Sequence, residues 1–150
     1  LVMPEMMEQV TGPLLKDKEL QCVNLVTEIV DKIEFNDPNV PKSVANIEGD
    51  LLYISREPIP SIKKADTNDY LKLKQLGIIA FRREFLQLFA RLDPTPLEQV
   101  ESVDMMRAVE HGYRVKLVET KHQMIGVDVP SDVQRVEKVL SSDPLINKYI

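Results

Sequence analysis

The sequence has few of the residues on which several common kinds of site depend. Its single cysteine, Cys22, excludes an internal disulfide and leaves no second thiol for a zinc site. Its five glycines are never closer than 14 residues apart, so neither a dinucleotide-binding Gly-x-Gly-x-x-Gly motif nor a phosphate-binding loop is present. Redox chemistry, structural zinc and glycine-rich nucleotide loops are therefore excluded for these 150 residues.

Long apolar runs and an excess of positive charge are also missing. No uninterrupted apolar stretch approaches the roughly 20 residues of a membrane-spanning helix, and no basic start leads into an apolar segment as in a signal peptide. The 19 Lys and Arg are outnumbered by 24 Asp and Glu, which gives a net charge of −5. A nucleic-acid binder usually shows a basic surface. We therefore expect a cytoplasmic protein with no nucleic-acid and no membrane partner.

The composition that remains is that of one globular domain. With 43% hydrophobic and 29% charged residues, 150 residues are enough for a sizeable core, so we predict a single domain over 1–150. The chain starts with Leu1 and leads directly into a helical pattern at Pro4. We expect it to be a piece of a longer protein.

Hydrophobic spacing and turn residues predict the elements of the first half. Pro41, which cannot donate to a strand ladder, favours an edge position for the first hairpin strand. Gly49 is expected in the hairpin turn. In order, we predict a helix from Pro4 that ends or kinks at Gly12 and Pro13, a strand over 22–29, a hairpin of 40–45 and 51–54, and a loop over 58–69.

In the second half, strands alternate with helices. Thr95, Pro96 and Glu98 form a capping-box start for one helix that continues to a stop at Gly112. The other predicted elements are a strand over 76–81 buried on both faces, a helix over 82–91, strands over 113–118 and 125–127, and a helix over 130–140. This alternation predicts an α/β layered fold.

Three places carry residues suited to ligand chemistry. Arg56 ends an apolar strand, where its planar guanidinium could grip a carboxylate at two points or simply pair with a nearby acidic side chain. Asp128 follows a short strand at an edge where open α/β sheets bind ligands, although it is equally placed to cap the next helix. Glu98 and Gln99 lie in a first helical turn, where capping and dipole complementation alone would explain them.

Four segments, in order along the chain, resemble motifs of the CMP-KDO synthetases (3-deoxy-manno-octulosonate cytidylyltransferases), which are relatives of the acylneuraminate cytidylyltransferases. The family motifs read roughly N-P-N-V with L-Y-F-S-R-x-P-I-P, H-I-G-I-Y-A-Y-R-R-E-F-L, P-T-P-L-E-Q and I-G-V-D-T-P-E-D. The matching segments of this chain are 37–40 with 52–60, 76–86, 94–99 and 125–132.

The resemblance implies the C-terminal part of a Rossmann-like nucleotidyltransferase domain, α/β with a mixed sheet and an inserted β-hairpin that serves dimerisation. The N-terminal part that binds CTP in the family is expected to be absent. Members use CTP, a sugar acid and Mg²⁺ to make a CMP-sugar and pyrophosphate for lipopolysaccharide or other surface polysaccharide. A homodimer is implied as well.

The resemblance also assigns residue roles. It makes Asp128 the catalytic magnesium ligand and places Arg56, Glu98 and Gln99 in the sugar-acid pocket. Gln75 stands where the family carries a pocket histidine, and Ile79 replaces a pocket tyrosine. Because isoleucine cannot hydrogen-bond a hydroxyl, we expect the parent enzyme to handle KDO differently from a typical member.

Two alternatives follow. The substrate could be an amino-KDO or a nonulosonic acid of the sialic type. The chain could also be a non-catalytic module that only folds, dimerises and binds sugar acid. In either case we expect these 150 residues alone to make no CMP-sugar, because they lack a triphosphate-binding loop.

Overall fold

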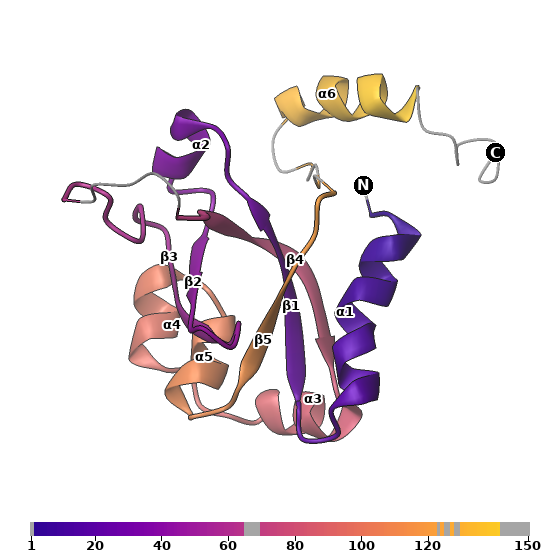
Figure 1. Cartoon of the computed structure of the whole chain (residues 1–150), viewed down its shortest axis with the longest axis vertical. Helices are drawn as coiled ribbons and strands as arrows, with labels where there is room; N and C mark the ends of the chain where they lie inside the picture. The colour runs from indigo at the N-terminus through magenta and orange to yellow at the C-terminus, as the bar shows by residue number, and fades with distance from the viewer. Residues whose placement is uncertain (1, 65–69, 123, 125–126, 128–129, 142–150) are drawn as a thin grey trace.

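The computed structural model describes residues 2–64, 70–122, 124, 127 and 130–141. They form an α/β fold in which helices pack on both faces of a five-stranded mixed sheet, whose strand order is β3-β2-β4-β1-β5 (Figure 1). The strands are β1 Cys22–Glu28, β2 Lys42–Ala45, β3 Leu51–Ser55, β4 Leu73–Phe81 and β5 Val115–Glu119. The helices are α1 Pro4–Lys16, α2 Lys32–Asn36, α3 Arg83–Phe89, α4 Pro96–Glu101, α5 Met105–Glu110 and α6 Pro130–Leu140.

Strand β1 lies between β4 and β5 and contributes side chains to two cores. It pairs parallel with β5 and antiparallel with β4. Its alternate side chains face opposite sides: Cys22 and Val26 belong to the core under α3 and α5, whereas Val23 and Leu25 belong to the core under α1. Burial on both sides explains why four of its seven residues are apolar, Cys22, Val23, Leu25 and Val26.

The predicted hairpin is confirmed, but its place in the sheet is not the predicted one. Gly49 has a positive φ of 78°, which suits glycine in the tight turn between β2 and β3. The edge prediction from Pro41 is wrong, because β2 lies between β3 and β4. Pro41 precedes the strand, so its missing N–H interrupts no ladder bond, and its carbonyl accepts from the N–H of Gln75 at 2.9 Å. Of the two hairpin strands, β3 is the one that lies at an edge of the sheet.

The prediction that residues 76–81 form a strand buried on both faces is also wrong. Leu76 and Ile78 are buried toward α1, but Gly77 between them is exposed and Gln75 and Ile79 are only half-buried. The strand is antiparallel to both neighbours and has one fully covered face. Its other face borders a cavity near Gln75.

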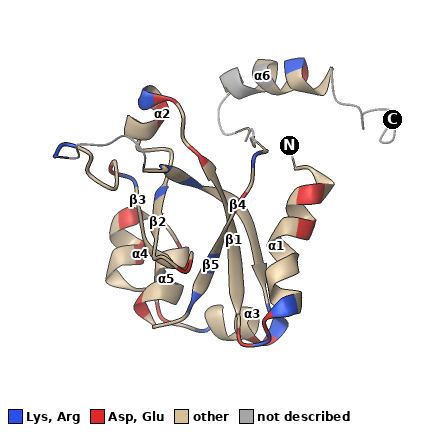
Figure 2. Ribbon diagram, in the orientation of Figure 1, with Lys and Arg blue, Asp and Glu red and all other residues tan. Residues whose placement is uncertain are grey.

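Helix α1 is longer than predicted. It passes through Gly12 and Pro13 and continues to Lys16, since packing of buried Met6 and Val10 against the sheet outweighs the hydrogen bond that a proline inside a helix removes. Figure 2 shows acidic residues near the start of α1 and basic residues near its end, as the helix dipole favours.

The single helix predicted after Thr95 is two helices. Ser102 adopts a left-handed conformation, with φ of 53°, and breaks the segment between α4 and α5. The stop at Gly112 is confirmed by its φ of 81°. The helix over 130–140 is confirmed as α6. The strand predicted over 125–127 and the site residue Asp128 fall outside the described residues. None of the helices in the described ranges is long and apolar enough to cross a membrane.

Candidate functional site

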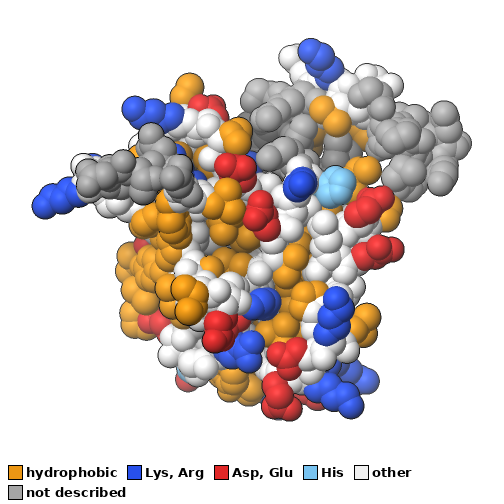
Figure 3. All heavy atoms as spheres, viewed as in Figure 1, with side chains coloured by type: hydrophobic (Ala, Val, Ile, Leu, Met, Phe, Trp, Pro, Cys, Tyr) orange, Lys and Arg blue, Asp and Glu red, His pale blue; other side chains and the backbone are white. Residues whose placement is uncertain are grey.

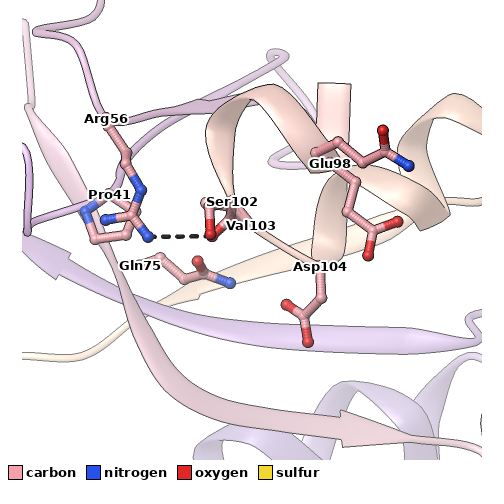
Figure 4. Close-up of a pocket in the computed structure, with 8 residues that line it drawn as sticks. Pro41, Arg56, Gln75, Glu98, Ser102, Val103 and Asp104 are labelled. Atoms are coloured by element: carbon pink, nitrogen blue, oxygen red, sulfur yellow. Dashed lines mark hydrogen bonds between the residues drawn. The ribbon is translucent and has the colours of Figure 1, made fainter. Parts of the chain in front are cut away.

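A cavity of about 420 Å³ opens where the segment before β2, the end of β3, strand β4 and the α4–α5 turn meet (Figure 4). It brings together four of the six positions that the resemblance placed in the site: Arg56, Gln75, Glu98 and Gln99. Of the other two, Ile79 is not in the lining and Asp128 is not described. The complete lining is Pro41, Arg56, Gln75, Glu98, Gln99, Ser102, Val103 and Asp104.

Arg56 follows β3 and spans two segments. Its guanidinium donates from Nε to the carbonyl of Glu101 at 2.7 Å, from Nη1 to that of Pro38 at 2.9 Å and from Nη2 to that of Ser102 at 3.1 Å. These bonds use three of its five N–H groups. The side chain thus fastens the segment before β2 to the end of α4, and its other two N–H groups suit an anionic ligand.

Glu101, which the sequence analysis missed, supports Arg56 from the end of α4. Its carboxylate accepts from the hydroxyls of Tyr53 at 3.0 Å and Ser55 at 2.9 Å, and from the backbone N–H of Arg56 at 2.9 Å. Burial by itself raises the pKa of Glu101, but these hydrogen bonds outweigh it and lower the pKa below the usual value. Glu101 belongs to none of the recognised motifs, so only the folded contacts reveal it.

Glu98 lines the cavity but is already neutralised inside the protein. It forms a two-point ion pair with Arg107, with 2.5 Å between Oε1 and Nη2 and 2.7 Å between Oε2 and Nε. It also accepts from the backbone N–H of Thr95 at 3.2 Å, which confirms the predicted helix start. The hydrogen bond from Arg107 lowers the pKa of Glu98. Such a paired carboxylate can accept a hydrogen bond from a ligand but is a poor proton acceptor.

The two glutamines contribute neutral amides from different elements. Gln75 comes from β4 and donates through Nε2 to Oδ1 of buried Asn24 at 2.7 Å, whereas Gln99 is exposed on α4. Ile79, expected beside Gln75 in the pocket, is not among the residues that line the cavity. It packs against the core under α3 and α5.

A second residue that the sequence analysis missed is Lys42, at the start of β2. Its side chain is completely buried, and Nζ donates to the carbonyls of Asp37 and Arg56 at 2.6 Å each. Burial lowers the pKa of Lys42, while Asp37 and Glu57 oppose that shift. Lys42 thus fixes the backbone of Arg56 by a hydrogen bond to its carbonyl.

This arrangement can bind a small, polar, acidic molecule. Its volume lies within the range of ligand sites, with a guanidinium at one side and amide groups nearby. Asp104 adds a second carboxylate to the lining. Within the ranges given above, no group of three His, Cys, Asp or Glu residues could hold a metal ion. The guanidinium and amide groups of the lining suit recognition and orientation of a ligand.

Comparison with known proteins agrees with these motifs. Residues 1–121 match the family model described as Cytidylyltransferase. The chain is 39% identical to the 3-deoxy-manno-octulosonate cytidylyltransferase of Geobacter metallireducens, with 94% of this chain and 59% of the relative covered. It is 37% identical to the enzyme of the same name from Desulfosudis oleivorans, with coverage of 95% and 57%.

A solved structure of a CMP:2-keto-3-deoxy-manno-octonic acid synthetase complexed with CTP is also similar. It aligns with a TM-score of 0.86 at 30% identity, covering 94% of this chain and 57% of that one. The chain thus spans somewhat over half the length of the relatives it matches. These matches identify it as a member of the cytidylyltransferase family.

Proposed function

We propose that this chain is the sugar-acid-binding part of an enzyme that transfers CMP from CTP to KDO and releases pyrophosphate. The observation that carries the proposal is the convergence of Arg56, Gln75, Glu98 and Gln99, from three separate segments, on one cavity. The resemblance assigned these positions to the sugar-acid pocket before any spatial relation between them was known. Membership in a cytidylyltransferase family favours an enzyme over a non-catalytic module.

The residues of the cavity bind and orient the acceptor in this proposal. The two N–H groups of Arg56 that make no hydrogen bond to the described residues face the carboxylate of the sugar acid, and the amides of Gln75 and Gln99 contact its hydroxyls. The anomeric hydroxyl then attacks the α-phosphorus of CTP, a new P–O bond forms and pyrophosphate leaves. Fixing the acceptor in one orientation lowers the entropic part of the barrier.

We include Mg²⁺ in the proposal only because the resemblance makes Asp128 its ligand. A magnesium site typically needs only one or two protein carboxylates, because substrate phosphates and water complete it, so a lone aspartate fits the donor set. When bound, the ion neutralises charge on the triphosphate. Asp128 lies outside the described residues.

KDO is the proposed substrate because the similar curated relatives carry its name. The alternative substrate is an amino-KDO or a nonulosonic acid. Of the two exchanges that suggested it, only Gln75 lines the cavity, so the alternative rests on Gln75 and not on Ile79. The requirement for CTP places the proposed enzyme in the cytoplasm, and its product would serve lipopolysaccharide synthesis.

A homodimer through the hairpin is part of the proposal, although part of the apolar surface of the hairpin is buried within the chain itself. Leu51 and Ile54 are buried in the core of the chain itself, whereas Leu52 on β3 is 55% exposed. Ile47 in the hairpin turn and Val100 on α4 are also exposed, and Figure 3 shows hydrophobic side chains gathered over this region. An exposed strand edge beside apolar side chains favours pairing with a second copy.

Light scattering of the complete protein at tens of micromolar tests the dimer. We expect a dimer mass that Leu52→Glu lowers to that of a monomer, while Ile33→Glu, on the exposed side of α2, leaves it unchanged. A monomer mass for the unchanged protein would contradict this part of the proposal.

The enzymatic proposal is tested by pyrophosphate release from CTP, Mg²⁺ and KDO with the complete protein. We expect turnover, and a loss on the order of 10² to 10³-fold in Asp128→Asn with the fold intact by circular dichroism. Absence of pyrophosphate release with KDO, an amino-KDO and a nonulosonic acid would contradict the proposed activity. Normal turnover by Asp128→Asn would leave Asp128 only as a helix cap.

A further inference from the structure

The orientation of one buried amide is set by the backbone around it. Asn24, on β1, is completely buried, and its Nδ2 donates toward the carbonyls of Leu76 at 2.9 Å, Leu25 at 3.0 Å and Ile78 at 3.3 Å. A rotated amide would place its oxygen against these three carbonyl oxygens and leave its nitrogen without them. The nitrogen of Asn24 therefore has to face the backbone, and its oxygen has to face away.

That oxygen in turn orients the amide of Gln75. Nε2 of Gln75 donates to Oδ1 of Asn24 at 2.7 Å, a short and well-formed bond. A rotated Gln75 would bring two carbonyl oxygens to this distance, which is repulsive. One N–H of Gln75 is therefore committed to Asn24 on β1, and Figure 4 shows the amide oxygen of Gln75 on the side of Ser102 in the cavity.

We propose that Asn24 is a positioning residue that fixes Gln75 so that the cavity presents a hydrogen-bond acceptor, and that the ligand binds there through an O–H or N–H group that it donates. The identity of the ligand as a sugar acid rests on the proposed function. A carbonyl oxygen only accepts hydrogen bonds. The ligand position that meets Gln75 therefore carries a hydroxyl or an amino group, and an analogue without a donor there binds more weakly.

This polarity distinguishes the chain from the family pattern it resembles. A histidine at the position of Gln75 can donate or accept, according to its tautomer. In this chain Asn24, which lies 51 residues away in sequence, fixes the Gln75 amide so that its oxygen, an acceptor, is the atom that faces Ser102 (Figure 4). Asn24 and Gln75 together therefore favour substrates that carry a hydrogen-bond donor at the position that meets the Gln75 oxygen, whichever sugar acid is used.

A double-mutant cycle on the complete protein tests this role, with kcat and the KM values for KDO and for CTP measured for each variant. We expect Gln75→Met to raise the KM for KDO about tenfold, because one hydrogen bond to the substrate is lost. Asn24→Ala should raise it several-fold by releasing Gln75. The double variant should be no worse than Gln75→Met, since Asn24 acts only through Gln75. The KM for CTP should stay unchanged.

The matched control is Thr27→Val, which removes another buried polar group from β1, one that donates to the carbonyl of Thr120 at 2.8 Å away from the cavity lining. It should lower the melting temperature and leave the KM for KDO as it was. Additive effects of Asn24→Ala and Gln75→Met, or equal changes in both KM values, would overturn the positioning role. An Asn24→Ala protein that does not fold leaves the test to the substrate analogues.

Monodeoxy analogues of KDO supply that second measurement. We expect one analogue to lose about tenfold in kcat/KM with the unchanged enzyme and to lose nothing further with Gln75→Met. If Gln75→Met alters the response to none of the analogues, the inferred donor contact is wrong even though the enzyme turns over. Failure of every sugar acid to react would instead contradict the proposed function.

Discussion

The two sides of the cavity are built from different chemistry. The side made by β3 and α4 is ionic: Arg56 hydrogen-bonds to Glu101, and Glu98 is paired with Arg107. The side made by the sheet is neutral, with Gln75 held by Asn24. Most of the bonding capacity of the charged side is used within the protein, whereas the amide oxygen of Gln75 faces the cavity.

This difference assigns rigidity of the site to the ionic side and selectivity among substrates to the neutral side. A charged group that already has protein partners is fixed in position before a ligand arrives, and its fixed donors cost little reorganisation. A neutral acceptor on a strand adds less energy, but it discriminates among substrates that differ by one hydroxyl. We therefore expect changes on the ionic side to reduce activity or stability strongly, and changes at Gln75 to alter preference.

Among the residues of the cavity and their supports, the largest effect is expected from Arg56→Lys in the complete protein. Lysine keeps the charge but cannot reach three carbonyls and a carboxylate with one planar group. We expect kcat/KM for KDO to fall about 100-fold, equivalent to roughly 3 kcal/mol of lost charged hydrogen bonds. Arg91→Lys, at an exposed position after α3, is the control and should be neutral. An Arg56→Lys enzyme with normal kinetics would show that the ionic side is not the site.

Lys42→Met tests the hydrogen bonds from Lys42 that fix the backbone around Arg56. Methionine fills a similar volume but leaves the buried carbonyls of Asp37 and Arg56 without their donor. We expect a loss of about 2 kcal/mol in the free energy of unfolding, measured by urea denaturation. Lys32→Met, on exposed α2, is the matched change and should be close to neutral. Equal stabilities of the two variants would show that the hydrogen bonds of Lys42 do not stabilise the fold.

The ion pair of Glu98 predicts a pH dependence. Its pKa in the folded protein lies below the ordinary 4.5, because Arg107 hydrogen-bonds the charged form. Its stabilising contribution is therefore fully present above pH 4.5 and is lost as pH falls through the lowered pKa. We expect Glu98→Gln to be less stable than the unchanged protein at pH 7, with the gap narrowing as pH falls below 4.5.

Urea titrations at several pH values measure that gap. Glu84→Gln, at an exposed position on α3, is the control and should show only a small gap in stability at pH 7. A constant gap for Glu98→Gln across the acid range would mean that the ion pair with Arg107 contributes no net stability.

The smallest effect is expected from Gln75→His, which restores the residue of the family pattern. We expect the fold to be unchanged and the ratio of kcat/KM for KDO over an amino-KDO to shift toward KDO by less than about tenfold. A ratio that stays constant would make the exchange of histidine for Gln75 neutral in specificity.

Local signals in the sequence predicted part of this fold correctly. The turn at Gly49, the helix start at Thr95 and the stop at Gly112 depend on the conformation of one or a few neighbouring residues, and all three are confirmed. The break at Ser102 was missed because serine carries no marked preference for a left-handed conformation. The prediction from Pro41 failed because sheet order depends on which strands pair, which a single residue does not determine.

The site was predicted as a set of residues but not as a structure. Arg56, Gln75, Glu98 and Gln99 came from motif resemblance, and the cavity brings them together. Asn24, Lys42 and Glu101 were missed, because each acts through contacts with residues distant in sequence and none belongs to a recognised motif. Their roles follow from buried polar groups that need partners, a requirement visible only after folding.

The most direct test of the central claim is a crystal structure of the complete protein with KDO bound. The account predicts KDO in the cavity between Arg56 and Gln75, with its carboxylate within hydrogen-bond distance of the guanidinium and one of its hydroxyls donating to Oε1 of Gln75. KDO bound away from these residues in an active enzyme would contradict it.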